Sequence, residues 1–351
     1  MLLYIHIPYC DSKCHYCSFN SYVDKFDTRK DYMLALYKQL AYELKRFDAK
    51  NRLIKTVFIG GGTPSTVDPK LYKPIFTLIK PYLQENAEIT TEANPNSATP
   101  SWLKGMKELG VNRISFGVQS FDDRKLKALN RAHDTSQAKE AIINAHQAGF
   151  KHISLDLIYN FKGDSKKLIE NDIKQAFLLP IDHISAYELT IEKGTLFSAT
   201  PELRQENDEL AFFVSSEIKK RGFKQYEISN FGTYQSEHNK GYWALDDYIG
   251  AGAGAVGFLK NIRYYPQNNI EDYIKNPFKI REEKLSDNEL LTEKIFLGLR
   301  SSIGIDKANL PEHIFKRAIL LADKGKLKIK ENHFYNKNYF LSDEISLFLM
   351  S

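Results

Sequence analysis

The sequence predicts an α/β fold in which a partly open, six-stranded (β/α)6 barrel precedes a small C-terminal α+β appendage. Three observations lead to this prediction. Short apolar runs alternate with amphipathic stretches from Leu2 to about Ile191, chemically useful residues follow the apolar runs, and the alternation stops after Thr190. Because six strands are fewer than the eight that close a full (β/α)8 barrel, we expect the barrel to remain open.

The six predicted strands are short and almost continuously apolar. They are LLYIHI (2–7), TVFIG (56–60), EITTE (88–92), RISFGV (113–118), HISLDLI (152–158) and HISAYEL (183–189). The stretches between them, such as residues 32–47 and 137–149, repeat apolar residues at a spacing near 3.6, as amphipathic helices do. Gly110 and Gly149 stand where such helices end. Apolar strands that alternate with helices indicate βαβ units and a parallel sheet.

Candidate ligand-binding residues follow all six strands. The strand ends carry, in order, a cysteine loop, GGGTPS (60–65), EANP (92–95), Gln119, Asp156, and the pair Tyr187 and Glu188. Since the carboxyl ends of parallel strands meet at one edge of the sheet, these groups should surround one site.

The composition is that of a soluble globular protein, with 42% apolar and 26% charged residues. The formal net charge is +5, and the lysines mostly have acidic neighbours, which indicates solvated faces rather than a nucleic-acid surface. No apolar run approaches the about 18 residues that span a bilayer. The N-terminal apolar run lacks a basic flank and is broken by His6 and Pro8, so we expect no signal peptide and a reducing, cytoplasmic location.

We expect three parts along the chain: the partial barrel (1–191), an extension (192–284) and a small winged-helix-like domain (285–351). The extension contains a predicted helix (202–222) and an irregular segment (226–257). The last part shows a helix, a glycine turn and two short strands. Its basic residues are compatible with nucleic acid, but no recognition helix with clustered arginines is visible. We therefore favour a lid that packs on the barrel and expect no nucleic-acid partner.

All three cysteines lie within the eight residues CDSKCHYC, at Cys10, Cys14 and Cys17. Three thiolates at this spacing can bind three irons of a cube-shaped cluster and leave the fourth iron open, whereas an electron-transfer cluster normally takes four cysteines. Two alternatives remain, namely a zinc site completed by His15 or His6, or free thiols. Zinc ligands usually come in pairs on two separate arms, so this clustering favours iron and sulfur.

Other residues at the strand ends could contact a ligand directly. The glycine triplet (60–62) would let the backbone approach closely, although a tight turn would need it equally. Glu92 could bind a ribose or an ammonium group, and Arg131 could pair with a carboxylate. Gln119 and Asp156 add further polar groups.

The segment SEHNKGYW (236–243) is a candidate haem-binding motif. His238 could ligate haem iron, while Tyr242 and Trp243 could stack on a porphyrin. A lone histidine more often has a structural role. The following run IGAGAGAVG (249–257) lacks the strand–turn–helix context of a dinucleotide fingerprint, so we expect it to bring the backbone close to the adenosine side of the site.

These motifs resemble those of a known family in their order along the chain and in their amino-acid sequence. The chain from residue 2 to about residue 260 is similar to the HemW family, relatives of the oxygen-independent coproporphyrinogen III dehydrogenases (HemN), through YIHIPYCDSKCHYCSFNSY, FIGGGTPS, TEANPNS, NRISFGVQSF, LNRAH, SLDLIY, YEISNF, HNKGYW and YIGAGAGAVG. The resemblance implies a radical S-adenosylmethionine (SAM) barrel with Cys10, Cys14 and Cys17 as ligands of a [4Fe–4S] cluster whose fourth iron binds SAM. It implies a SAM site at Tyr4, Gly61, Gly62, Thr63, Glu92, Gln119, Arg131, Asp156 and Val256.

Two features separate the branches of this family. The dehydrogenases typically continue the cluster motif as CxxxCxxCxC, whereas Phe19 stands two positions after Cys17 here. They also lack the HNxxYW motif that runs from His238 to Trp243 in this chain. The resemblance therefore implies a haem chaperone that binds cluster, SAM and haem, with His238 as the leading haem contact beside Tyr242 and Trp243.

The resemblance also implies partners. They are haem and the respiratory proteins that accept it, and a homodimer and peripheral membrane contact are compatible with the family. Enzymatic activity stays open, since oxidative decarboxylation of coproporphyrinogen III to protoporphyrinogen IX is the alternative function.

Two departures from the family pattern stand out. The loop after the fifth strand reads YNFKGDS (159–165) and lacks the proline of the usual GLPGQ-like sequence, and Glu237 stands where many relatives have cysteine or arginine. The second departure excludes thiol attachment of haem at that position.

Overall fold

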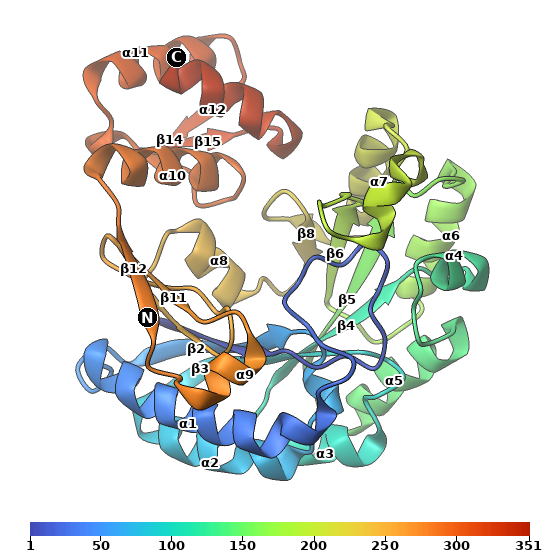
Figure 1. Ribbon diagram of the computed structural model, residues 1–351. Coiled ribbons are helices and arrows are strands. Elements are labelled where there is room, and N and C mark those ends of the chain that lie inside the picture. Colours follow the sequence, from blue (N-terminus) through green and yellow to red (C-terminus); the bar gives the residue numbers. More distant parts are fainter.

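The computed structural model describes residues 1–351 and contains a twelve-stranded sheet that does not close on itself (Figure 1). Its centre is six adjacent parallel strands. They are β1 (Leu2–Ile7), β2 (Ile54–Gly61), β3 (Leu83–Ala93), β4 (Arg113–Gln119), β5 (His152–Tyr159) and β6 (His183–Glu188). The prediction of a partly open six-stranded parallel barrel is confirmed.

Helices cover the outer face of this sheet (Figure 1). They are α1 (Arg29–Arg46), α2 (Pro69–Ile79), α3 (Pro100–Glu108), α4 (Asp123–Ala128), α5 (Thr135–Gln147), α6 (Lys166–Ala176) and α7 (Asp208–Lys220). The apolar faces of all these helices except α4 join the sheet in one cluster of 58 buried hydrophobic residues. Polar caps start several helices, for instance the capping box of Asp134 and Gln137 on α5. Gly110 and Gly149 follow α3 and α5 with φ of +105° and +88°, so they end these helices as predicted.

Short strands extend the parallel core at both edges. Beyond β1 lie β9 (Tyr248–Ala251), β10 (Gly257–Leu259), β11 (Ile262–Pro266) and β12 (Ile280–Lys284), and beyond β6 lie β8 (Asn230–Gly232) and β7 (Lys224–Gln225). Strand β9 is parallel to β1, whereas β8 is antiparallel to β6. Helices α8 (Glu237–Trp243) and α9 (Ile270–Lys275) lie between these strands in the sequence.

The prediction that residues 226–257 are irregular is therefore wrong for much of that segment. The glycine-rich run begins as strand β9, and a Cβ on Gly250 would lie 2.0 Å from the Val256 carbonyl oxygen. Glycine is required there because the chain folds back on itself. Strands this short and small show no hydrophobic periodicity, so their pairing with β1 and β6 could not be read locally.

The C-terminal segment packs around a separate cluster of ten buried hydrophobic residues. Its elements are α10 (Asp287–Leu299), β13 (Ile305–Asp306), α11 (Glu312–Asp323), β14 (Leu327–Lys330), β15 (His333–Asn336) and α12 (Ser342–Met350). Main-chain hydrogen bonds join this C-terminal segment to the barrel extension. The Ile228 amide donates to the Arg300 carbonyl oxygen, and the Ser302 amide donates to the Tyr226 carbonyl oxygen. The division of the chain into parts at residues 191 and 284 stays a prediction. Strands β8 to β12, which follow residue 191, extend the barrel sheet and do not form a sheet of their own.

Seven 3-10 helices complete the secondary structure. They are η1 (Phe26–Thr28), η2 (Pro64–Thr66), η3 (Lys80–Tyr82), η4 (Leu196–Ala199), η5 (Pro201–Leu203), η6 (Lys307–Asn309) and η7 (Tyr339–Leu341). None of the helices combines the length and the apolar character that a membrane crossing needs.

Candidate functional site

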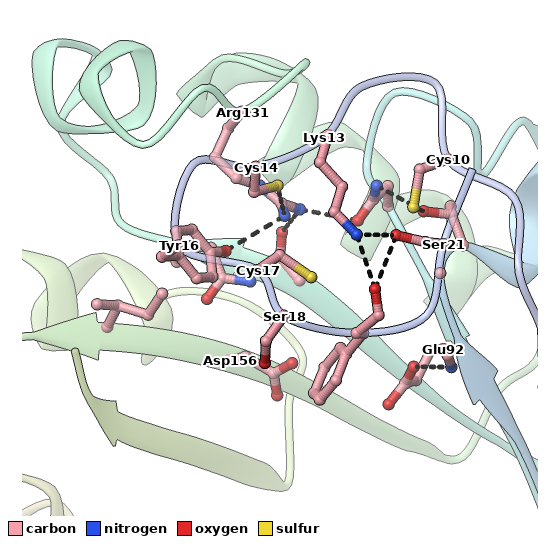
Figure 2. A pocket seen from close by; sticks show the side chains of 18 of the residues that line it. Cys10, Lys13, Cys14, Tyr16, Cys17, Ser18, Ser21, Glu92, Arg131 and Asp156 are labelled. Atoms are coloured by element: carbon pink, nitrogen blue, oxygen red, sulfur yellow. Dashed lines mark hydrogen bonds between the residues drawn. The ribbon is translucent and has the colours of Figure 1, made fainter. Parts of the chain in front are cut away.

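A cavity of about 390 Å³ opens at the carboxyl edge of the parallel strands, and its wall comes from the loop after β1 and the ends of β2 to β6 (Figure 2). It is large enough for a small-molecule ligand. The predicted site residues that line it are Cys10, Cys14, Cys17, Gly61, Gly62, Thr63, Glu92, Gln119, Arg131 and Asp156. Tyr4 and Val256 do not line it; the Tyr4 hydroxyl contacts His6 Nδ1 at 2.9 Å instead.

The three cysteines come from one loop and face this cavity (Figure 2). Thr63 donates a hydrogen bond from Oγ1 to Cys10 Sγ (3.4 Å), and Arg131 donates one from Nη1 to Cys14 Sγ (3.1 Å). Burial raises the pKa of the Cys10 and Cys17 thiols. Binding of iron would therefore displace protons from these two sulfurs.

The donor set fits a cube-shaped cluster better than a single metal ion. No three His, Cys, Asp or Glu side chains are grouped so that they could hold one ion together. A cubane cluster takes one thiolate on each of three irons, so its ligands stand farther apart. His6 does not complete a zinc site here, because its ring nitrogens contact the Tyr4 hydroxyl and the Asn20 carbonyl. The His15 ring packs edge-on against Phe197.

The glycine triplet is needed by the protein's own packing as well as by the cavity. A Cβ on Gly61, whose φ is +115°, would lie 2.5 Å from the His6 ring, and one on Gly62 would lie 2.8 Å from the Tyr9 carbonyl oxygen. This packing supports the alternative explanation of the triplet, in which a tight turn of the chain requires glycine. Gly61 and Gly62 still line the cavity, and the Gly61 amide donates to Glu92 Oε2 at 3.1 Å.

Two carboxyl groups line the cavity, Glu92 from β3 and Asp156 from β5. Burial, and secondarily the charge of Asp156, raises the pKa of Glu92 to about 8. Burial raises the pKa of Asp156 to about 6, against the hydrogen bonds of Ser185 and Ser115. Two acids in a partly dehydrated site resist joint ionisation, so a cation or a hydroxyl donor between them would be favoured.

The raised pKa of Glu92 predicts a pH-dependent stability for the ligand-free protein. The unfolded chain ionises Glu92 near 4.5 and the native chain near 8, so its stabilising contribution is present below 4.5 and is lost as the pH rises to 8. We expect Glu92→Gln to melt near the wild-type temperature at pH 5 and a few degrees above it at pH 8.5. Thermal denaturation across this range checks the difference. The exposed Glu108→Gln variant is the control, and a Glu92→Gln difference that stays constant with pH would contradict the prediction.

Arg131 is fixed between the cluster loop and the sheet. Its Nη2 donates to the Gly117 carbonyl oxygen (2.6 Å) and to Asn94 Oδ1 (2.8 Å), while Nη1 reaches Cys14. Its Nε atom is buried without a hydrogen-bond partner. Gln119 also lines the cavity, held in the left-handed backbone region with φ of +73°.

Several cavity residues were not predicted. They are Lys13, Ser21, Ser115 and Gly117, among others, while Asn94 of the predicted EANP segment also lines the cavity. Lys13 Nζ donates to the Phe19 carbonyl oxygen and to Ser21 Oγ, both at 2.7 Å, and so closes the cluster loop (Figure 2). Asn94 had a signal in the EANP motif, but side-chain directions within an irregular loop follow no period.

The three predicted haem residues do not line this cavity. His238 on α8 is only 1% exposed; its Nδ1 contacts Thr56 Oγ1 at 2.7 Å, and its Nε2 has no partner. The ring lies between Phe58 and Tyr242, at centroid distances of 5.1 and 4.7 Å. Burial lowers the pKa of His238 to about 3. Thr56 lies near the start of β2, so His238 occupies the barrel interior away from the cysteine loop.

A single carboxylate holds the beginning of α8 in place. Glu88, which is 4% exposed, accepts hydrogen bonds from the amides of Glu237 (2.9 Å) and His238 (3.1 Å). It also accepts from the hydroxyls of Ser236 and Tyr234. These four donors fix the helix that buries His238.

Comparison with known proteins identifies several similar chains. The radical SAM superfamily model matches residues 4–176. The chain is 32% identical to the haem chaperone HemW of Bacillus subtilis, over 95% of this chain and 94% of that protein. It is 39% identical to the haem chaperone HemW of Escherichia coli, over 73% of this chain and 69% of that protein.

A solved structure supports the fold. Coproporphyrinogen III oxidase (HemN) from Escherichia coli, described as a radical SAM enzyme, superposes with a TM-score of 0.82 over 99% of this chain and 89% of that one. The two sequences are 19% identical, so this likeness concerns the fold alone.

Proposed function

Because the chain belongs to the HemW family of radical SAM proteins, we propose that it is a haem chaperone. It would hold a [4Fe–4S] cluster, bind SAM in the cavity, and carry haem to respiratory acceptor proteins. The observation that carries this proposal is the 32% identity with a haem chaperone over 95% of the chain. We expect it to act in the cytoplasm.

The cavity supports the cluster and SAM components of this proposal. Cys10, Cys14 and Cys17 would each bind one iron, and the bound group would supply one-electron chemistry at its fourth iron. Arg131, held beside Cys14, would pair with the carboxylate of a bound amino acid. Glu92 would accept hydrogen bonds from an ammonium or a ribose and lose its proton as it does so.

The haem component rests on His238, together with Tyr242 and Trp243. The unpartnered Nε2 of His238 supports this role, because a buried ring nitrogen without a hydrogen bond is free for another ligand. Since the ring is 1% exposed, haem could reach it only after α8 separates from Glu88. Homodimer formation and peripheral membrane contact remain predictions.

The alternative function is oxidative decarboxylation of coproporphyrinogen III; the likeness to HemN, at 19% identity, supports a shared fold and not this activity. Phe19 argues against it. This residue stands where the dehydrogenases typically carry a fourth cysteine, and it is 64% exposed beside the cavity.

One experiment separates the two functions. Protein reconstituted anaerobically with iron and sulfide is loaded with haem and mixed with membranes that contain a haem-free respiratory enzyme. We expect haem to move to the acceptor and restore its activity. A parallel sample receives SAM, a reductant and coproporphyrinogen III, and no decarboxylated product is expected. Product formation without haem transfer would overturn the proposal in favour of the enzyme.

A further inference from the structure

Three consecutive residues after α4 hold the cluster loop. The Leu129 carbonyl oxygen accepts a hydrogen bond from the His15 amide (3.3 Å). The Asn130 side chain donates to the Lys13 carbonyl oxygen (2.9 Å) and to Ser12 Oγ (3.1 Å). Arg131 then reaches Cys14 Sγ (Figure 2). Hydrogen bonds with residues 129–131 therefore hold the loop between Cys10 and Cys17 in place.

The position of the segment depends on α4, which has only six residues. Lys125 of α4 is 4% exposed, and its Nζ donates to both carboxylate oxygens of Asp164 at 2.8 Å and to the Ile158 carbonyl oxygen at 2.6 Å. All three ammonium protons are thus used inside the protein. Such a fully satisfied ion pair has one preferred geometry, so it fixes α4 against the end of β5.

Asp164 also shapes the loop after β5. Its Oδ2 accepts from the Phe161 amide (3.0 Å), and its own amide donates to the Phe161 carbonyl oxygen (2.9 Å). Asn160 in the same loop has φ of +64°, and the loop contains no proline that would restrict it. The contacts of Asp164 therefore restrain a loop that joins directly to Ile158 at the cavity wall.

A second carboxylate, Asp172, holds the segment that connects β4 to the start of α4. Asp172 of α6 is 1% exposed and accepts from Ser120 Oγ (2.8 Å) and from the Phe121 amide (2.7 Å). These residues lie between Gln119 and α4. Two carboxylates thus hold α4 in place: Asp172 bonds to the residues before the helix, and Asp164 bonds to Lys125 within it. The contact between Lys125 and Asp164 is the one nearer to the cluster loop.

From these contacts we infer that Lys125 and Asp164 are positioning residues for the cluster: they place α4 so that Leu129, Asn130 and Arg131 preorganise the cysteine loop. The inference rests on the cluster-binding part of the proposed function and is independent of haem. Neither residue touches a cysteine, so both act through α4. Groups that hydrogen-bond a metal ligand directly change metal affinity by about 10- to 100-fold when they are lost. Arg131 is such a group here, and Lys125 with Asp164 would act by positioning it.

The decisive variant replaces both members of the pair by apolar residues, Lys125→Met with Asp164→Leu. Removing both charges avoids leaving either partner as an unpaired buried ion. The Phe161 amide and the Ile158 carbonyl oxygen lose their partners, so we expect a folded protein with a lower but still cooperative unfolding transition. We expect the reconstituted cluster to be lost to a chelator about tenfold faster than from the wild type. We also expect an altered electron paramagnetic resonance spectrum, because the Arg131 hydrogen bond to Cys14 Sγ shifts.

The matched control is Glu43→Leu with Arg46→Met. Glu43 and Arg46 form another ion pair, at 2.7 Å on α1, in which the Glu43 side chain is buried and the Arg46 side chain is 19% exposed; neither residue lines the cavity. This variant should keep the wild-type cluster lifetime and spectrum. If both double variants behave alike, general destabilisation explains the loss and the inference is overturned.

Hydrogen exchange of the cluster-free protein gives a readout that does not need the cluster. The His15 amide should exchange about tenfold faster in the Lys125/Asp164 variant than in the wild type or the control. If the variant does not fold, the wild type still provides a test: the amides of His15, Arg131 and Asp164 should exchange through one common opening, with the same denaturant dependence. Separate openings, or a folded variant with unchanged exchange, would contradict the inference. Failure of the wild type to take up a cluster would instead count against the proposed function.

Discussion

Replacing Cys14 by serine is expected to abolish cluster binding. Only three cysteines exist in the chain, all three line one cavity, and each would bind a separate iron. A serine hydroxyl is a far weaker ligand than a thiolate, so we expect iron and acid-labile sulfide to fall by at least about tenfold after anaerobic reconstitution. Chemical analysis of iron and sulfide and the visible absorbance of the cluster measure this loss.

The control for this variant is Ser18→Ala, in the same loop and on the same cavity wall. It should bind a full cluster. The same analysis tests the zinc alternative, because a zinc site would contain zinc without sulfide. Wild-type protein that takes up zinc but no sulfide, or a Cys14→Ser variant that keeps its cluster, would disprove the ligand assignment.

Replacing His238 by alanine is expected to have two separate effects. Removing a ring that is 1% exposed leaves a cavity against Phe58, so the free energy of unfolding should fall by about 2–4 kcal/mol. If His238 contacts haem as proposed, haem affinity should also fall about tenfold or more, which corresponds to about 1.4 kcal/mol. Haem titration followed by absorbance, and chemical denaturation, measure the two effects.

The control for His238 is His183→Ala. His183 is also fully buried in the barrel, but its nitrogens contact Ser154 Oγ (2.7 Å) and the Tyr226 hydroxyl (2.8 Å). Its loss should lower stability without changing haem affinity. Equal haem affinity in both variants and the wild type would mean that the haem ligand lies elsewhere.

The parallel core was predictable because its signals are local and repeat. Six apolar runs separated by amphipathic stretches indicate βαβ units, and parallel strands direct their carboxyl ends to one edge. That rule alone brought together Cys10, Gly61, Glu92, Gln119 and Asp156, which are up to 146 residues apart in the chain and share one cavity wall.

The barrel extension was not predictable in the same way. Strand β9 has four residues and β8 has three, too few to show alternation, and each is defined by its partner strand. The same holds for His238. Its motif suggested a haem contact and said nothing of exposure, whereas the pairing of Glu88 with the start of α8 encloses it.

The sequence by itself determined the fold class, the three thiols on one loop, and the edge of the sheet where the cavity opens, since residue type, spacing and periodicity carry that information. Only the tertiary structure decided which side chains enter the cavity from irregular loops, how Lys125 and Asp164 brace α4, and that His238 is enclosed. These features depend on hydrogen bonds between residues far apart in the chain, such as the 2.7 Å contact of Thr56 with His238. Their geometry follows from how the elements pack, and no local pattern of residues records it.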